Sequence, residues 1–442
     1  MEPARAPYRD HVQRAVEAIR AALAREGYDR LVVHSGALQP KNPFDDQDWP
    51  FDPVPTFRYL APMSWPDCVV VIEARDVPPT LYALESDSFW ERRSEPDWSL
   101  LEAALDVKRV TSLEAMHSIS WDGAGAFIGN GPREGISTPT MTVNPTEIVE
   151  ALHELRTVKS DWEIACMEQA SLRAARGHLR AAQRFDAGER SELAIHLSYL
   201  DASEQDDADC PYKNIVALGE NGATLHHIEY RHMPDAASLL IDAGGRHLGY
   251  CADITRTHVA PDAGPDAARF ASLVDAVEQL QLRVIGRVEP GLSYESLHDF
   301  AHQEMAQLLV DAELVSCSPE TAVETGLTRT FFPHGLGHHL GVQVHDVAGL
   351  PHKPRPENRF LRNTRTIEAG QVFTIEPGLY FIGGLLAPLR AQPDGASVVW
   401  ETVDALRRFG GIRIEDNILV LPEGSEPRVR NLTREAFARA ES

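Results

Sequence analysis

The chain has 442 residues, of which 43% are hydrophobic and 24% are charged, and its formal net charge is −24. This length is too great for one ordinary core, so the composition predicts a globular protein of two domains. The acidic balance argues against nucleic-acid binding, which needs a basic surface, and no uncharged apolar run is long enough to predict a membrane span. The first residues lack the apolar region of a secretory signal, and five scattered cysteines without a Cys-x-x-Cys pair favour a reduced cytoplasm.

The first part of the chain alternates helical and strand patterns. Val12, Val16 and Leu23 belong to an apolar helical stripe over residues 10–25, which Gly27 ends. Short apolar runs typical of buried strands follow at residues 31–34, 68–72, 81–84 and 126–129. Strands that alternate with helices predict an N-terminal α/β domain with a mixed sheet flanked by helices.

A change of composition marks the expected boundary between the two domains. Residues 132–145 are rich in Pro, Gly, Ser and Thr, which is the composition of a linker. Soon afterwards, Ser160 and Glu163 have the spacing of a capping box and predict the start of a long helix. We therefore expect an N-terminal domain over residues 1–155 and a C-terminal catalytic domain over residues 156–442.

Two extended runs in the C-terminal part are separated by a short turn. They cover residues 238–243 and 249–258, with Gly-Arg-His-Leu between them. Their spacing predicts two antiparallel strands, which would place Asp242 and Asp253 side by side. The C-terminal domain is therefore expected to be of the α+β class.

Five side chains of metal-ligand type stand in short phrases of this part of the chain: Asp242 in Ile-Asp-Ala-Gly, Asp253 in Ala-Asp-Ile-Thr, His338 in Gly-His-His, Glu376 in Ile-Glu-Pro-Gly, and Glu415 in Ile-Glu-Asp-Asn. Taken singly, such an Asp or Glu is usually a turn former or a strand cap. Asp242 and Glu415 nevertheless follow apolar strand residues, where an unpaired charge costs on the order of several kcal/mol. Four carboxylates and one imidazole hold two divalent metal ions if some carboxylates bridge, as a dinuclear hydrolase requires.

This set, in this order, resembles the pita-bread metallopeptidases, and the flanking phrases are similar to their Xaa-Pro dipeptidase (prolidase) branch. The resemblance covers about residues 34–417 and implies a pita-bread α+β catalytic domain. It also implies that these five residues bind two divalent metal ions per subunit, with Asp253 and Glu415 as the bridging pair. Oxygen-rich ligands with one imidazole suit Mn²⁺ first, with Co²⁺, Mg²⁺ and Zn²⁺ as alternatives.

The histidines of residues 334–345 carry a further part of the resemblance. His338 and His339 are adjacent, so either could be the ligand. In the family the ligand precedes the histidine of Val-His-Asp by seven residues, which selects His338. His345 then resembles the residue that donates to the scissile carbonyl or to the tetrahedral oxyanion, and His334 resembles a substrate-pocket histidine.

The family also implies pocket residues earlier in the chain. Tyr212 and His226 match segments of the substrate pocket, and His227 stays open as an alternative to His226. Phrases near the N-terminus resemble a loop that reaches the active site of the partner subunit in a homodimer. Asp45, or Asp46 as the alternative, would there bind the free amino group of a dipeptide.

Two arginines and one carboxylate complete the expected site. Arg362 matches the family arginine that binds the substrate carboxylate, a task that suits a guanidinium fork. Arg413 lies two residues before Glu415 and so faces the same side of the strand, where it would orient the metal cluster or line the pocket. Glu376 is expected to transfer the proton during catalysis.

The resulting expectation is a metal-dependent dipeptidase that hydrolyses Xaa-Pro dipeptides with a trans proline at the C-terminal position. Proline makes the scissile bond a tertiary amide without an N–H donor, and two metal ions would activate a bridging water to attack it. An Xaa-Pro aminopeptidase acting on longer peptides, and a side activity on organophosphorus esters, stay open as alternatives. A non-enzymatic binding protein of this fold predicts lost ligands, whereas all five are present.

Overall fold

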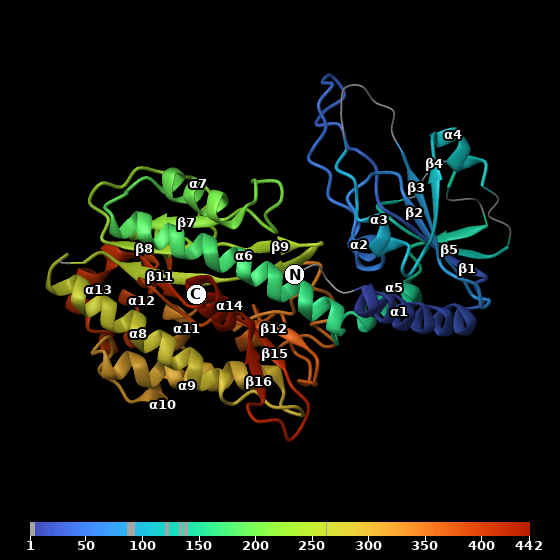
Figure 1. The fold of residues 1–442 in the computed structure, drawn as a ribbon. Coiled ribbons are helices and arrows are strands. Elements are labelled where there is room, and N and C mark those ends of the chain that lie inside the picture. The colour runs from blue at the N-terminus through green and yellow to red at the C-terminus, as the bar shows by residue number, and fades with distance from the viewer. Residues whose placement is uncertain (1–4, 86–92, 120–122, 132–134, 137–139, 262) are drawn as a thin grey trace. The chain divides into compact units, whose positions relative to one another are not determined.

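The structure, a computed structural model, describes residues 5–85, 93–119, 123–131, 135–136, 140–261 and 263–442 (Figure 1). The chain divides into two compact units. Unit 1 comprises Met1–Cys166 and Leu248–Tyr250, and unit 2 comprises Met167–His247 and Cys251–Ser442. Among the described residues, no helix combines the length and the apolar character needed to cross a membrane.

Unit 1 is built on one six-stranded mixed sheet, as predicted for the N-terminal domain. The strand order is β4-β3-β2-β1-β5-β6, with β1 antiparallel to β2 and parallel to β5. β1 lies inside the sheet because Leu31, Val32 and Val33 are buried on both of its faces. In chain order the strands are β1 (Arg30–His34), β2 (Val69–Glu73), β3 (Thr80–Leu84), β4 (Asp106–Val110), β5 (Gly125–Ile128) and β6 (Met141–Val143).

Helices accompany this sheet. The predicted apolar stripe lies on α1 (Arg5–Glu26), whose Val12, Val16 and Leu23 are buried. This helix packs against α5 (Thr146–Leu155) and against β1 and β2. The remaining helices of unit 1 are short: α2 (Pro55–Leu60), α3 (Trp98–Leu101) and α4 (Leu113–His117).

The linker predicted over residues 132–145 is wrong for its second half. Met141–Val143 form β6, which pairs with β5 and so belongs to the sheet of unit 1. Residues 132–134 and 137–139 of the same stretch lie outside the described residues. A composition of turn-forming residues therefore surrounds an edge strand, and it does not mark the end of the domain.

Unit 2 contains several small antiparallel sheets. Their strand orders are β11-β8-β7, β12-β15-β16, β13-β14 and β10-β9. The strands are β7 (Ile215–Leu218), β8 (Ser238–Asp242), β9 (Gly245–His247), β10 (Tyr250–Ala252), β11 (Thr255–Val259), β12 (Val372–Ile375), β13 (Gly378–Tyr380), β14 (Gly411–Arg413), β15 (Asp416–Val420) and β16 (Val429–Asn431). Short antiparallel strands beside long helices give unit 2 the predicted α+β class.

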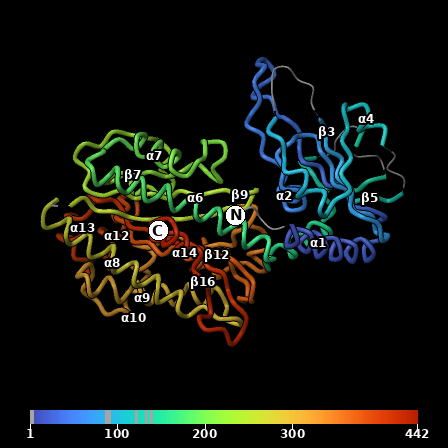
Figure 2. Tube along the Cα trace, viewed as in Figure 1, coloured from blue at the N-terminus to red at the C-terminus, as the bar shows by residue number. Residues whose placement is uncertain are grey.

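Helices lie on two sides of these strands. Figures 1 and 2 show α6 and α7 next to β7, α8 and α9 on the opposite side of unit 2, and β12 and β16 toward one end of it. The helices are α6 (Asp161–Asp186), α7 (Glu192–Ser203), α8 (Pro265–Ile285), α9 (Tyr294–Asp311), α10 (Pro319–Glu324), α11 (Leu327–Phe331), α12 (Gly383–Arg390), α13 (Trp400–Leu406) and α14 (Leu432–Glu441). Short 3-10 turns occur at η1 (Gly219–Ala223), η2 (Pro356–Asn358), η3 (Pro393–Ser397) and η4 (Arg407–Phe409).

The largest apolar core of unit 2 supports the strands from the α8 side. Apolar residues at helical spacing line the buried face of α8, among them Phe270, Val277 and Val284. They belong to one cluster with Ile375 at the end of β12 and Ile414 just after β14. This packing fixes the ends of both strands, from which the next residues of the chain enter the site.

The predicted pairing of the extended runs is correct, but the segment between them is not a simple turn. β8 pairs antiparallel with β11, with Asp242 opposite Thr255. The expected turn contains β9, which pairs with β10. The second run is interrupted between β10 and β11, and Asp253 lies in this interruption.

Candidate metal centre and active site

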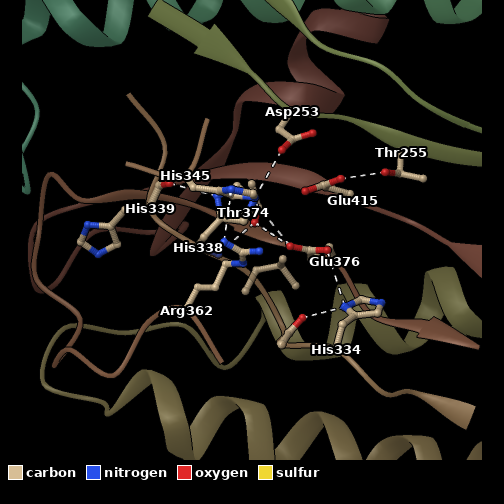
Figure 3. A network of polar contacts seen from close by, with 12 residues as sticks. Asp253, Thr255, His334, His338, His339, His345, Arg362, Thr374, Glu376 and Glu415 are labelled. Atoms are coloured by element: carbon tan, nitrogen blue, oxygen red, sulfur yellow. Dashed lines mark hydrogen bonds and ion pairs between the residues drawn. The ribbon is translucent and has the colours of Figure 1, made fainter. Parts of the chain in front are cut away.

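Three buried side chains from distant segments of unit 2 converge on one point. Asp253, His338 and Glu415 each present a ligand atom, and these atoms lie within 4.8 Å of one another (Figure 3). Glu415 lies in the interruption between β14 and β15, and its N–H donates to the carbonyl of Thr255 at 3.1 Å. The His338 carbonyl accepts from the N–H of Thr374 in β12 at 2.9 Å. Backbone hydrogen bonds to neighbouring strands therefore hold the segments that carry the donors.

The other two predicted ligands border the same group. The Nε2 atom of His338 lies 3.4 Å from Oδ2 of Asp253 and 3.6 Å from Oε1 of Glu376. The hydroxyl of Tyr212 contacts both Asp253 and, at 2.7 Å, Asp242. All five predicted ligands line one cavity of about 450 Å³. The structure thus brings the whole predicted set together.

His338 is oriented as a ligand by its neighbour. Its Nδ1 lies 3.0 Å from the carbonyl oxygen of His339, which can only accept, so Nδ1 carries the hydrogen. Nε2 faces Asp253 and Glu376, and although burial disfavours a charge on this ring, its hydrogen bond to Asp253 and the charges of both carboxylates raise its pKa. In a metal-bound site Nε2 would give up its hydrogen and bind the ion through its lone pair. The ring of His339 lies away from the carboxylates (Figure 3).

Burial and mutual repulsion shift the pKa values of the clustered carboxyl groups. Burial, followed by the charges of Asp253, Glu376 and Asp242, raises the pKa of Glu415 well above its usual range. Burial likewise raises the pKa of Glu376 to about 7. Burial acts in the same direction on Asp253, but the hydrogen bond and charge of His338 outweigh it and lower the pKa of that carboxyl. So many buried carboxyl groups favour bound cations, and their oxygen atoms suit hard divalent metals.

A second polar chain starts at Asp242. The Arg413 guanidinium donates to Oδ2 of Asp242 at 2.7 Å and to the Tyr380 hydroxyl at 2.8 Å. That hydroxyl lies 2.8 Å from Nε2 of His334, whose Nδ1 lies 2.8 Å from the carbonyl of Gly335. Burial, and then the charge of Arg413, lower the pKa of His334 to about 3, so this ring is neutral near pH 7. These hydrogen bonds hold the Arg413 guanidinium in place as the positive partner of Asp242.

His345 and Arg362 lie next to the ligand histidine. The rings of His338 and His345 are 4.4 Å apart at 87° (Figure 3). The Nη1 atom of Arg362 lies 3.3 Å from Nδ1 of His345. Because a guanidinium only donates, Nδ1 accepts, and the neutral ring carries its hydrogen on Nε2. Burial, and then the charges of His338 and Arg362, lower the pKa of His345 to about 4 and keep it neutral.

Comparison with known proteins agrees with this geometry. Residues 165–422 match the family described as metallopeptidase family M24, and residues 6–153 match the Xaa-Pro dipeptidase N-terminal domain. The chain belongs to metallopeptidase family M24.

Relatives of this M24 protein extend over nearly the whole chain. An Xaa-Pro dipeptidase of Pseudoalteromonas atlantica is 40% identical over 439 residues, which is 96% of this chain and 98% of that protein. An Xaa-Pro dipeptidase of Marinobacter nauticus is 40% identical over 432 residues, 96% of this chain and 97% of that protein.

Solved structures confirm the fold. Aminopeptidase P from E. coli with the inhibitor Pro-Leu has a TM-score of 0.72 at 23% identity, covering 98% of this chain and 99% of that one. Pseudomonas aeruginosa aminopeptidase PepP has a TM-score of 0.71 at 21% identity, covering 97% and 98%. The predicted pita-bread architecture of the catalytic part is therefore correct.

The remaining predicted pocket residues of the M24 protein lie in different places. His226 lines the cavity, whereas His227 is buried and lies 2.8 Å from Glu192. The hydroxyl of Tyr212 contacts two of the expected metal ligands, Asp242 and Asp253, and its predicted contact with the substrate stays a prediction. Asp45 is exposed in unit 1, where its carboxylate accepts from the N–H of Gln47 at 3.2 Å.

Two residues of the M24 site are not among the predicted ones. The Thr255 hydroxyl donates to Oε2 of Glu415 at 2.7 Å. Thr255 lies two residues after Asp253, so the alternation of side chains in an extended segment could have indicated it. Tyr380 links Arg413 to the pocket only because β13 pairs with β14, and this register leaves no local signal in the sequence.

Proposed function

We propose that this M24 protein is an Xaa-Pro dipeptidase that uses two divalent metal ions, Mn²⁺ first. The curated relatives that share 40% of its residues bear that name. The observation that carries the proposal is the position of Arg362. Its guanidinium lines the same cavity as the five acidic and histidine ligands and lies beside His345. A cavity with a carboxylate-binding cation beside a metal centre matches a short peptide with a free C-terminus.

The residues of the chain divide the task among themselves. Arg362 binds the carboxylate of the proline with the guanidinium N–H groups that its hydrogen bond to His345 does not use. His345 donates its Nε2 hydrogen to the carbonyl oxygen on which negative charge develops. Glu376 accepts a proton from the attacking water and returns it to the proline nitrogen, which leaves as the amine. When bound, the metal ions polarise the carbonyl and activate the attacking water.

Length selectivity tests the proposal against an aminopeptidase acting on longer peptides. Ala-Pro places its carboxylate at Arg362, whereas Ala-Pro-Ala and Ala-Pro-amide place a neutral amide there. We expect kcat/KM to be at least about 10²-fold higher for Ala-Pro, the scale of discrimination that loss of a charged hydrogen bond produces. Equal rates for the tripeptide would contradict the proposal.

A variant pair sharpens the same test. Arg362→Ala should strongly lower kcat/KM for Ala-Pro and so reduce the ratio of kcat/KM between Ala-Pro and Ala-Pro-Ala. Arg359→Ala removes another cation from the wall of the same cavity and should leave the ratio of kcat/KM between Ala-Pro and Ala-Pro-Ala unchanged. If the effects of the two substitutions are exchanged, Arg359 is the carboxylate ligand.

We also propose that the protein is a cytoplasmic homodimer. In this arrangement the N-terminal domain, residues 1–155, serves dimerisation and access to the active site, while residues 156–442 form the catalytic domain and Asp45 binds the substrate amino group of the partner's site. The match of residues 6–153 to the Xaa-Pro dipeptidase N-terminal domain supports this role. Sedimentation analysis of the wild type should give a dimer, and Asp45→Ala should raise KM without changing the mass. A monomer with full activity would contradict it.

A further inference from the structure

A fully buried carboxylate lies beside the segment that carries His226. Glu192 is the first residue of α7 and is 0% exposed. Its Oε1 accepts from the N–H of Leu218 and from the side-chain amide of Asn221, both at 2.8 Å. Its Oε2 contacts Nε2 of His227 at 2.8 Å and accepts from the N–H of Arg231 at 2.7 Å. One side chain therefore binds the beginning, the middle and the end of residues 218–231.

Backbone hydrogen bonds also join the start of α7 to the end of residues 218–231. The N–H of Glu192 donates to the Arg231 carbonyl at 3.0 Å, and the N–H of Met233 donates to the Arg190 carbonyl at 2.9 Å. Ser191 and His232 also form an isolated β-bridge. The start of α7 is thus joined to the chain just after the segment.

The middle of the segment has little support of its own. Residues 224–230 form neither helix nor strand, and within them only His227 is buried. Leu225 and His226, directly before it, line the active-site cavity together with Asp253 and His338. The contact between His227 and Glu192 therefore fixes the turn from which both residues reach the cavity.

We propose that Glu192 is a positioning residue for substrate binding, which holds residues 218–231 in the conformation that places Leu225 and His226 on the cavity wall. The inference rests on the proposed dipeptidase function. Among the described residues, the side-chain contacts of Glu192 are to Leu218, Asn221, His227 and Arg231 and include none of the five predicted metal ligands, so we assign its effect to the population of the binding-competent cavity. Affinity falls in proportion to that population, while the catalytic groups keep their geometry.

Full-length, Mn²⁺-loaded enzyme tests this with Ala-Pro as substrate. In Glu192→Gln one oxygen becomes an NH₂ group, which cannot accept from a backbone N–H. We expect KM to rise about tenfold, as it does when the competent population falls to about a tenth, with kcat within about twofold of the wild type. Hydrogen exchange of the amides of Leu218 and Arg231 should accelerate, and metal content should stay unchanged.

Substitutions at His227 provide a matched pair. His227→Leu removes the donor and should raise KM in the same way, whereas His227→Gln keeps an N–H group at similar reach and should restore wild-type KM. Glu163→Gln serves as the control, because Glu163 is also a buried carboxylate near a helix start, accepting from the N–H of Ser160 at 2.9 Å in unit 1. It should affect stability and leave KM unchanged.

The outcomes separate the two proposals. A wild-type enzyme that does not cleave Ala-Pro refutes the proposed function. A wild-type enzyme that cleaves Ala-Pro, with unchanged KM and exchange rates in Glu192→Gln and His227→Leu, overturns the positioning role. A fall in kcat and in bound metal that accompanies the rise in KM would show a purely structural role for Glu192 and would also overturn the positioning role. If Glu192→Gln does not fold, the His227 pair decides.

Discussion

Acid should destabilise this protein through histidines that are buried without charge. Burial is the main cause that lowers the pKa of His178 to about 3, of His298 to about 4 and of His302 to about 2, from an ordinary value of 6.5. Below pH 6.5 the unfolded chain binds protons that the folded chain does not. The stabilisation by these neutral rings is therefore complete above pH 6.5 and is lost as the pH falls toward the lowered pKa values.

The size of this effect follows from the shifts. Each such histidine lowers the free energy of unfolding by up to ~1.4 kcal/mol per pH unit in this window. Integrated from pH 7 to pH 5, the loss is ~2 kcal/mol for each ring and ~6 kcal/mol for all three. That sum is comparable to the whole stability of many domains, so a marked fall in the free energy of unfolding is expected near pH 5.

His302→Phe isolates one of these contributions. The ring of His302 stacks on Phe332 with centroids 5.0 Å apart, so a benzene ring can keep this packing. Urea unfolding of the metal-loaded variant at pH 7 and pH 5 should show a loss of unfolding free energy between the two pH values that is ~2 kcal/mol smaller than in the wild type. His352→Phe, at an exposed position, controls for the loss of a histidine as such. Equal pH dependence in His302→Phe and wild type would refute the reasoning.

The metal centre supports three further predictions. Chelation should abolish Ala-Pro hydrolysis and lower the melting temperature. Added Mn²⁺ should raise the melting temperature progressively, because a ligand that binds the folded state stabilises it. Full activity in protein that elemental analysis shows to contain no metal would contradict the metal centre. His338→Ala should lose metal and activity while His339→Ala keeps both, and a reversed result would assign the ligand to His339. His345→Ala should keep its metal but lose about 10²–10³ in kcat, the usual effect of removing one donor to a developing oxyanion; a parallel fall in metal content would make His345 a ligand.

Short-range patterns in the sequence were enough for much of the fold and for the outline of the site. Apolar runs indicated β1, β2, β3 and β5, and the short phrases around Asp253 and Glu415 indicated carboxylates that the structure indeed brings together. The strand signal is local, because a strand needs only its own apolar residues, whereas the ligand phrases indicated a metal site through their resemblance to a family, since each phrase taken singly is weak.

Features that depend on pairing between distant segments could not be predicted in this way. Tyr380 reaches Arg413 through the register of β13 and β14, and Glu192 receives donors from residues up to 39 positions away. The supposed linker failed for the same reason, since pairing with β5 makes residues 141–143 a strand despite their surroundings. Composition describes a segment alone, whereas pairing depends on what lies beside it.

The dispersal of the ligands among interrupted strands has a consequence for how the protein reaches its active form. Asp253, His338 and Glu415 come from segments that are far apart in the chain and meet only when β11, β12 and β14 have found their partners. No partial folding intermediate limited to one of these segments can offer the whole site. Metal uptake should therefore be a late event of folding, and it should be slow because the site forms only after long-range strand pairing. The rate of metal incorporation would then report how fast the native strand pairing is completed.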